Sequence, residues 1–481
     1  MTDSVKNWKG AARKLKHRAR DWTDKKRFAV EERVARTMDR TVRLAVTGLR
    51  RSGKTVFTMS VVHLLKYLRA QPDLLAHLGI AEVVSVQVSA IPDLDAARFP
   101  YEQCIGSLSE NPPRWPEGTR DVSQVRVTMR YRRVRKRSAR LSGVRTLRLD
   151  FVDYPGEWLL DLPLINKSYA EWSRQTLAYA EQPTRAKLAA EWRAFINGLD
   201  PIQSAGFAFG KMKRGAALFR EYLLASQQAG LQCVQPGRFI MPGDLEGGLL
   251  LDFFPMQGPQ AVPGDALIAE LERRFDAYRE RVIGEFHSKY FAGFDRQVVL
   301  VDILSVLNAG QEVFADTRVA LSEILENFRY GNSSWRTRLF RPRIDRVLIA
   351  ATKADRVSRD QSPLLRHFLE AMLGETRESL AARGKRIQVS YQAISALCCT
   401  KDVKCSLNGV PASCIQGVPV GGSELVTLFP GQVPSRPPPD DDWQGYDFRD
   451  FIPPGGRYRH GETMDHLQMH AALRYLIGDK L

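Results

Sequence analysis

Apolar residues follow two different spacings along this chain, and the spacings alternate in its first and last parts. Val42, Leu44 and Val46 alternate with other residues, as in a strand, and apolar positions recur at helical spacing from 56 to 68. The same two patterns return downstream, with strands predicted at 298–304, 347–351 and 387–394 and helices at 313–330 and 363–383. Strands that alternate with helices predict an α/β fold with a mostly parallel sheet.

One antiparallel hairpin is predicted between 122 and 151. Val125, Val127, Met129 and Tyr131 alternate with polar residues, and no acidic residue occurs from 122 to 149, so this hairpin is strongly basic. Arginine on an edge strand protects against aggregation, and it equally attracts anionic lipid or an acidic protein. Because Tyr131 is the only aromatic residue in that basic stretch, nucleic acid is the least favoured partner.

A run without strand patterns follows the hairpin. Helices are predicted near 167–196, 211–229 and 265–291, joined by loops rich in Gly and Pro. We interpret this run as a helical insertion, either moved by a phosphate-sensing turn or acting as a passive lid. The expected organisation is an N-terminal helix at 1–40, a nucleotide-binding domain in two parts at 41–156 and 294–481, and the insertion at 157–293.

Length and composition fit this organisation. A chain of 481 residues with 44% apolar content can build two or three domains. We expect neither a membrane span, since no apolar run approaches the roughly 18 residues required, nor a signal peptide, since residues 1–40 are charged throughout. The six cysteines do not resemble the disulfide framework of a secreted protein. These features favour a cytoplasmic protein.

The net charge of +17 is concentrated in two places, the hairpin and residues 1–40. The first forty residues hold 13 Lys and Arg against 6 Asp and Glu, with apolar positions at spacings of three and four. This pattern predicts a basic amphipathic helix that lies on an anionic membrane surface or an acidic partner, or packs on its own domain. Its apolar positions are Trp8, Ala12, Leu15, Ala19 and Trp22.

A phosphate-binding pattern, Gly-x-x-x-x-Gly-Lys-[Ser/Thr], lies between the first predicted strand and helix. In such a P-loop, backbone N–H groups close around phosphates because glycine permits the necessary turns, and the following helix adds its positive dipole. We expect Lys54 to reach the β- and γ-phosphates and Thr55 to bind Mg²⁺. The predicted phosphate-binding residues are Gly48, Ser52, Gly53, Lys54, Thr55 and Val56.

An Asp-x-x-Gly turn ends the second strand of the hairpin. Opposite a P-loop, its Asp holds Mg²⁺ through water and its Gly amide senses the γ-phosphate, so we assign these roles to Asp153 and Gly156. Glu157 follows, where small GTPases often carry a glutamine that orients the attacking water. Our hypothesis places Glu157 near that water and gives Arg50 or Arg51 the role of a counter-charge. The alternative is that both arginines point outwards and Glu157 caps a helix.

The stretch 93–119 contains four prolines and comes just before the hairpin. We expect it to form the loop that closes over the nucleotide. A Thr or Ser hydroxyl from this loop would complete the Mg²⁺ shell, and Thr119 is our choice.

A guanine-recognition pattern, Thr-Lys-Ala-Asp at 352–355, ends the strand predicted at 347–351. The Asp355 carboxylate can accept hydrogen bonds from guanine N1–H and the 2-amino group, while the Lys353 stem lies along the ring. Adenine offers neither donor, so GTP and GDP are favoured over ATP. After the next strand, Ser395 and Ala396 are placed for a backbone contact to the guanine carbonyl.

The last part of the chain carries three weaker patterns. Four cysteines at 398, 399, 405 and 414 lack the paired spacing of a zinc site, so we expect buried or free thiols. Residues 430–456 are rich in Pro, Gly and Asp and predict an irregular surface segment. Apolar positions from 467 to 477 predict a final helix that docks on the sheet.

Four runs, at 44–57, 99–103, 150–163 and 476–481, carry a resemblance to a known family. The run at 150–163, Asp-Phe-Val-Asp-Tyr-Pro-Gly-Glu-Trp-Leu-Leu-Asp-Leu-Pro, is the most specific. Together they resemble the bacterial YcjX stress proteins. The resemblance implies a GTPase-like P-loop domain with a helical insertion, in a cytoplasmic protein of the phage-shock envelope-stress response. It also implies a partner of the YcjF type in the inner membrane, where the protein would be peripheral.

Three functions are compatible with these features of the sequence. The first is an Mg²⁺-dependent switch that hydrolyses GTP slowly, favoured by Lys54, Thr55, Asp153 and Asp355 in this order. The second is a module that binds GTP or ATP with little hydrolysis, which Glu157 leaves open. The third is a scaffold that docks on a membrane or a membrane protein. The sequence does not define the oligomeric state.

Overall fold

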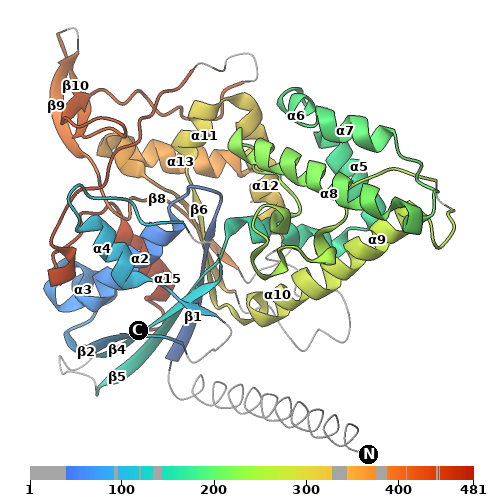
Figure 1. The fold of residues 1–481 in the computed structure, drawn as a ribbon. Coiled ribbons are helices and arrows are strands. Elements are labelled where there is room, and N and C mark those ends of the chain that lie inside the picture. Colours follow the sequence, from blue (N-terminus) through green and yellow to red (C-terminus); the bar gives the residue numbers. More distant parts are fainter. Residues whose placement is uncertain are drawn as a thin grey trace, which may run out of the picture.

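The computed structural model describes residues 40–91, 96–118, 121–133, 143–259, 261–327, 344–374, 387–407, 409–439, 443 and 445–481. Within these ranges a central sheet of eight strands has the order β2-β4-β5-β1-β6-β7-β8, and β3 pairs with β4 (Figure 1). β5, β1, β6, β7 and β8 are parallel neighbours, as predicted, whereas β4 is antiparallel to β2 and β5. The strands are β1 (Arg40–Gly48), β2 (Glu82–Ser89), β3 (Ala97–Arg98), β4 (Ser123–Arg132), β5 (Arg145–Asp153), β6 (Arg296–Val301), β7 (Arg346–Ala351) and β8 (Gln388–Ala393).

Helices cover both faces of this sheet, because its strands bury side chains on both sides. Leu44 and Val46 of β1 belong to the cluster formed with α2, α3, α4 and α15, whereas Ala45 belongs to the cluster with α11, α12 and α13 (Figure 1). The final helix therefore docks on the sheet, as predicted. These helices are α2 (Lys54–Lys66), α3 (Pro72–Leu78), α4 (Tyr101–Leu108), α11 (Ile303–Ala309), α12 (Gln311–Asn327), α13 (Ser362–Met372) and α15 (Met469–Ile477).

The prediction of a strand at 298–304 is wrong at its C-terminal end. β6 stops at Val301, and α11 begins at Ile303. Asp302 causes the change of direction, because its carboxylate accepts a hydrogen bond from the Ser305 N–H at 3.1 Å and caps the helix. Because the apolar run continues past the capping residue, the spacing of hydrophobic residues alone does not show where the strand ends.

The basic hairpin of β4 and β5 lies inside the sheet and not at its edge. β2 pairs with the free side of β4, so protection of an edge strand does not explain the arginines. Arg126 instead makes a bidentate ion pair with the buried Asp150, at 2.6 and 2.8 Å. Residues 134–142, between the two strands of the predicted hairpin, lie outside the described residues.

The run after β5 is helical, as predicted, but its elements are more divided. A 3-10 helix at Gly156–Asn166 comes first, and a π-helical turn at Arg279–Ile283 joins the last two α-helices. The aromatic side chains of Trp172, Phe219 and Phe275 pack within this region, with ring centroids 5.0 to 6.0 Å apart where Trp172 contacts the two others. The α-helices are α5 (Tyr169–Tyr179), α6 (Pro183–Leu188), α7 (Ala190–Asn197), α8 (Ala205–Gln228), α9 (Leu267–Tyr278) and α10 (Gly284–Lys289).

This helical region is joined firmly to one face of the sheet. Its aromatic residues and the apolar residues of β6, α11 and α12 form one continuous hydrophobic cluster. A buried ion pair between Arg185 of α6 and Asp316 of α12, at 2.7 Å, connects the two parts. Asp316 also accepts hydrogen bonds from the N–H groups of Gln232 and Cys233, which follow α8. The end of α8 is therefore fixed to the α/β part.

The segment between β8 and α15 differs from the expectation in two ways. Three strands form a second sheet, and Cys405 and Cys414 form a disulfide across β9 and β10, so these two cysteines are not free thiols. The described residues between 430 and 456 are irregular, as predicted, but Phe448 and Phe451 are buried, so this part of the chain is not simply a surface loop. The strands are β9 (Lys401–Leu407), β10 (Val410–Gly417) and β11 (Val426–Leu428).

Several sequence-based predictions fall outside the described residues. They concern Thr119, the amphipathic helix apart from Arg40, and the ends of the helices predicted at 313–330 and 363–383. Among the helices that the structure describes, none is both long enough and apolar enough to cross a membrane.

Candidate functional site

The turn between β1 and α2 has an unusual backbone that its sequence explains. Gly53 has a φ of 84° immediately before α2 begins, and Arg51 has a φ of 61°. Gly48 lies so close to β6 that an added Cβ would overlap the backbone oxygen of Leu300. Lys54 bends back over the turn, and its Nζ donates to the Gly48 carbonyl at 3.0 Å. Glycine is therefore needed at both ends of the turn, and the lysine ammonium lies above it.

The Asp-x-x-Gly turn lies directly beside the β1–α2 turn. Asp153 at the end of β5 is buried and pairs in register with Val46 of β1. An added Cβ on Gly156 would overlap the Gly48 carbonyl oxygen and come within 3.2 Å of Lys54 Nζ. Two motifs that are about a hundred residues apart in the sequence are therefore in contact. This proximity follows from the parallel pairing of β1 with β5, which places their carboxyl ends together.

The Asp355 carboxylate is fixed by two hydrogen bonds at the end of β7. Ser395 Oγ donates to Oδ1 at 2.6 Å, and the Cys399 N–H donates to Oδ2 at 2.7 Å. Burial raises the pKa of the Asp355 carboxyl above its usual range, against the effect of these hydrogen bonds. The Ser395 N–H donates to the Leu467 carbonyl at 3.1 Å, so of the two predicted backbone contacts the Ala396 N–H remains the better candidate.

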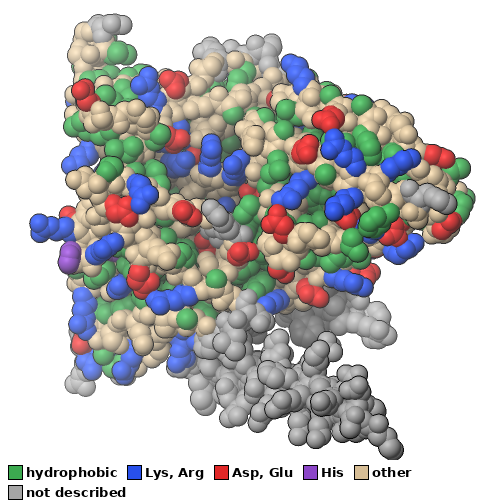
Figure 2. Space-filling view, viewed as in Figure 1, with side chains coloured by type: hydrophobic (Ala, Val, Ile, Leu, Met, Phe, Trp, Pro, Cys, Tyr) green, Lys and Arg blue, Asp and Glu red, His purple; other side chains and the backbone are tan. Residues whose placement is uncertain are grey.

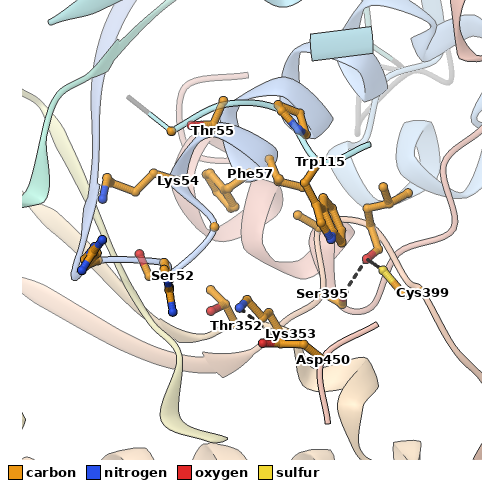
Figure 3. A pocket seen from close by; sticks show the side chains of 18 of the residues that line it. Ser52, Lys54, Thr55, Phe57, Trp115, Thr352, Lys353, Ser395, Cys399 and Asp450 are labelled. Carbon is orange, nitrogen blue, oxygen red and sulfur yellow. Dashed lines mark hydrogen bonds and ion pairs between the residues drawn. The ribbon is translucent and has the colours of Figure 1, made fainter. Parts of the chain in front are cut away.

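Lys353 has a left-handed backbone, with a φ of 55°, and its ammonium lies between two carboxylates. Nζ is 2.7 Å from Asp302. It is 3.5 Å from Asp450, which lies beside it in Figure 3. Burial lowers the pKa of Lys353, but the two carboxylates outweigh burial and the pKa is raised. Burial likewise raises the pKa of Asp302, but Lys353 and Arg356 hold it below its usual range. The lysine is therefore charged and its stem is held in place.

One cavity of about 650 Å³ connects the β1–α2 turn with Lys353 and Asp355, and Glu157 also lines it. Residues 50–57 form one wall, so that the phosphate-binding pattern faces the guanine-recognition pattern across the cavity (Figure 3). The opposite wall is formed by residues 352, 353, 355, 356, 394–397 and 399. In the face shown in Figure 2 the surface is hollowed between the two halves of the molecule, and Lys and Arg side chains gather beside the hollow. A basic hollow attracts anions.

Two further walls come from the loop after α4, which lies in the stretch 93–119 expected to close over the nucleotide, and from the segment 430–456, whose role the sequence did not indicate. Trp115 lies in the loop after α4, is 39% exposed, and donates from Nε1 to the Phe451 carbonyl at 3.2 Å. Asp450 and Phe451 belong to the irregular segment 430–456. Their participation depends on how distant segments pack, and no local pattern marks it.

Glu157 and Arg50 both contact the end of α8. Gln227 Nε2 donates to Glu157 Oε1 at 3.0 Å, and Arg50 Nη1 donates to the Gln227 carbonyl at 3.4 Å. Glu157 lies in the first turn of a 3-10 helix but bonds a side chain from another helix. Arg51 is exposed and lines the same cavity. Gln227, which the sequence did not mark, is thus a residue of the helical region that contacts two of the predicted catalytic residues, Glu157 and Arg50.

Comparison with known proteins identifies relatives over nearly the full chain. The family model described as "YcjX-like family, DUF463" matches residues 42–481. "Ras-like GTPase YcjX" of Escherichia coli is 36% identical over 467 residues, which cover 93% of this chain and 97% of that protein. "Ras-like GTPase YcjX" of Shewanella oneidensis is 38% identical over 474 residues, which cover 93% and 96%.

The mostly parallel sheet and its covering helices, together with these relatives, define a mixed α/β protein consistent with the P-loop GTPase-like class. The groups expected to bind nucleotide lie at the carboxyl edge of that sheet, where such proteins bind ligands. The chain belongs to the YcjX-like family.

Proposed function

We propose that this protein binds guanine nucleotide with Mg²⁺ and slowly hydrolyses GTP. The observation that carries the proposal is the single cavity of about 650 Å³ between residues 50–57 and Asp355. A volume of this size suits a nucleotide, and the cavity offers backbone N–H groups and an ammonium at one end and a fixed carboxylate at the other. The relatives bear the name Ras-like GTPase, which favours the same function.

The residues have separate roles in this proposal. The turn from Gly48 to Val56 binds the phosphates, and the Lys54 ammonium exchanges the Gly48 carbonyl for phosphate oxygens. Asp355 accepts hydrogen bonds from guanine N1–H and the 2-amino group, and the Lys353 stem lies along the base. Gly156 senses the γ-phosphate, Glu157 acts near the attacking water, and Arg50 or Arg51 supplies positive charge.

The described residues include donors that suit Mg²⁺. The Thr55 hydroxyl lies in the first turn of α2. The Asp153 carboxylate lies at the end of β5, the strand that pairs with β1. Hydroxyl and carboxylate oxygens are the hard ligands that Mg²⁺ prefers, with water and phosphate completing its shell. When bound, Mg²⁺ would neutralise phosphate charge. We retain Thr119 as a proposed further ligand.

The first test is the binding of Mg²⁺ and a GTP analogue that resists hydrolysis, measured by calorimetry on the full chain. We expect Lys54→Ala to weaken binding about 10- to 100-fold, since charged hydrogen bonds to phosphate are lost. Lys66→Ala is the matched control, because Lys66 ends the same helix and lies outside the cavity. Equal affinity of wild type and Lys54→Ala would overturn the proposed phosphate site.

The family resemblance adds a cellular setting, which we also propose. The protein would act in the cytoplasm in the envelope-stress response, with an inner-membrane partner or an anionic membrane surface bound by residues 1–40 and the basic hairpin. The region 157–293 would be an inserted domain that follows the nucleotide state. Flotation with anionic vesicles tests the surface part: we expect the full chain to float and a chain lacking residues 1–40 to remain in the soluble fraction.

A further inference from the structure

The helical region places a carboxamide beside the residue that follows the Asp-x-x-Gly turn. Gln227 Nε2 donates to Glu157 Oε1 at 3.0 Å, and both side chains line the cavity that also contains Lys54 and Thr55. A smaller cavity of about 10 Å³, close to the space that one water molecule needs, lies against Arg50, Gly156, Glu157 and Gln227. The amide and carboxylate thus meet next to the backbone expected to sense the γ-phosphate.

The position of Gln227 is well defined by the end of α8. Gly230, with a φ of 92°, closes the helix: its N–H donates to the Gln227 carbonyl at 3.1 Å, and the Leu231 N–H donates to Ser226 at 3.1 Å. Asp316 then holds the next two N–H groups, and Arg50 contacts the Gln227 carbonyl. A side chain whose backbone is held from several directions is suited to a task that requires a fixed geometry.

We propose that Gln227 orients the water that attacks the γ-phosphate, and that Glu157 positions Gln227; this rests on the proposed GTP hydrolysis. The hydrogen bond to Glu157 uses the Gln227 Nε2 and leaves its Oε1 to accept from water. The water oxygen forms a bond to the γ-phosphorus as the bond to the β–γ bridging oxygen breaks. GDP leaves with that oxygen, and the water protons leave with inorganic phosphate and to solvent.

This arrangement gives a reason for a glutamate at 157. A carboxylate close to the γ-phosphate would repel it. When the Glu157 carboxylate accepts a hydrogen bond from Gln227, the neutral Gln227 amide, and not the carboxylate, faces the water. The water-orienting residue then comes from the helical insertion, so hydrolysis requires α8 to be docked. The insertion would act as a built-in activating element.

The test is single-turnover GTP hydrolysis by the full chain, with binding of a non-hydrolysable GTP analogue measured in parallel. We expect Gln227→Ala to slow hydrolysis at least about tenfold with unchanged affinity and melting temperature. Gln228→Ala is the matched control, since Gln228 is the exposed neighbour on the same helix end, and it should hydrolyse at the wild-type rate. Glu157→Ala should slow hydrolysis as much as Gln227→Ala, and the double variant should be no slower.

The conservative variant separates positioning from direct base catalysis. Glu157→Gln keeps an oxygen for Gln227 Nε2, so it should lose less of the rate than Glu157→Ala, whereas a true general base would lose as much in both variants. A wild-type rate for Gln227→Ala overturns the inference and leaves the proposed function standing. A wild-type protein that binds GTP without hydrolysing it overturns both the inference and the hydrolytic part of the proposed function, while the proposed nucleotide site still stands. Failure of the wild type to bind GTP overturns the proposed function itself.

Discussion

The Asp161 side chain, in the 3-10 helix at Gly156–Asn166, is buried within the helical region. It accepts hydrogen bonds from the Gly237 N–H and the Tyr278 hydroxyl, each at 2.6 Å. Burial raises the pKa of Asp161 to about 6, although both hydrogen bonds favour the ionised form. The pKa in the folded protein is therefore above that of the unfolded chain.

This shift predicts how stability depends on pH. The folded state keeps a proton that the unfolded state loses above pH 3.8, so stability from this group is present at low pH and is lost as pH rises through about 6. Asp161→Asn does not titrate, and its amide can accept from Gly237 and donate to the Tyr278 oxygen. We expect the unfolding free energy of wild type to fall by about 2 kcal/mol relative to Asp161→Asn between pH 4 and pH 7.

Urea unfolding of both proteins across this pH range makes the measurement. Because only the difference between the two proteins is used, other titrating groups cancel. A difference that stays constant with pH would show that Asp161 has an ordinary pKa in the folded protein.

At the scale of elements, the turns after β1 and β5 approach so closely that there is no room for a side chain at Gly156. Replacing Gly156 with Ala places a methyl group against the Gly48 carbonyl and 3.2 Å from Lys54 Nζ. We expect Gly156→Ala to lower the free energy of unfolding by about 1–3 kcal/mol and to weaken GTP binding, because Gly48 or Lys54 must move.

Gly118→Ala is the control for this substitution. Gly118 also lines the cavity, but none of the described residues lies within 4 Å of its added methyl group. Thermal unfolding and nucleotide calorimetry on the two variants make the comparison. If Gly156→Ala matched Gly118→Ala in both, the close approach of the two turns would not matter for binding.

The same scale shows what a sequence can and cannot predict. The β1–α2 turn, the Asp153 turn and the Asp355 strand end were predicted because local patterns place each at the carboxyl end of a parallel strand, and such ends meet. The boundary at Asp302 was missed because the apolar run continues through it. Gln227 and Phe451 were missed because they reach the cavity through the packing of distant segments. The second sheet was missed because apolar and polar residues do not alternate strongly along its strands.

At the scale of the whole molecule, the Arg185–Asp316 pair holds the helical region against the sheet. Both side chains are at most 4% exposed, and Asp316 also anchors the chain after α8. We expect Asp316→Asn to cost about 3–5 kcal/mol of stability, because it leaves the Arg185 charge buried without its partner. Hydrogen exchange of the amides near 226–237 should then become faster.

Asp244→Asn serves as the control for that variant. Asp244 is 3.3 Å from Arg238, but its side chain is 82% exposed, so the loss of this ion pair should change stability by no more than about 1 kcal/mol. Equal effects of the two substitutions would mean that the buried pair does not hold the two parts together.

Recognition of guanine by Asp355 is tested most directly by calorimetric binding of GDP, ADP and xanthosine diphosphate, each with Mg²⁺, to wild type, Asp355→Ala and Asp355→Asn. We expect wild type to bind GDP at least about a hundredfold more tightly than ADP, and Asp355→Ala to lose that preference. Asp355→Asn should bind xanthosine diphosphate more tightly than wild type does, since the asparagine amide can donate to the carbonyl that replaces the 2-amino group of guanine. Equal affinities of wild type for GDP and ADP would contradict the account, because Asp355 would then not read the base.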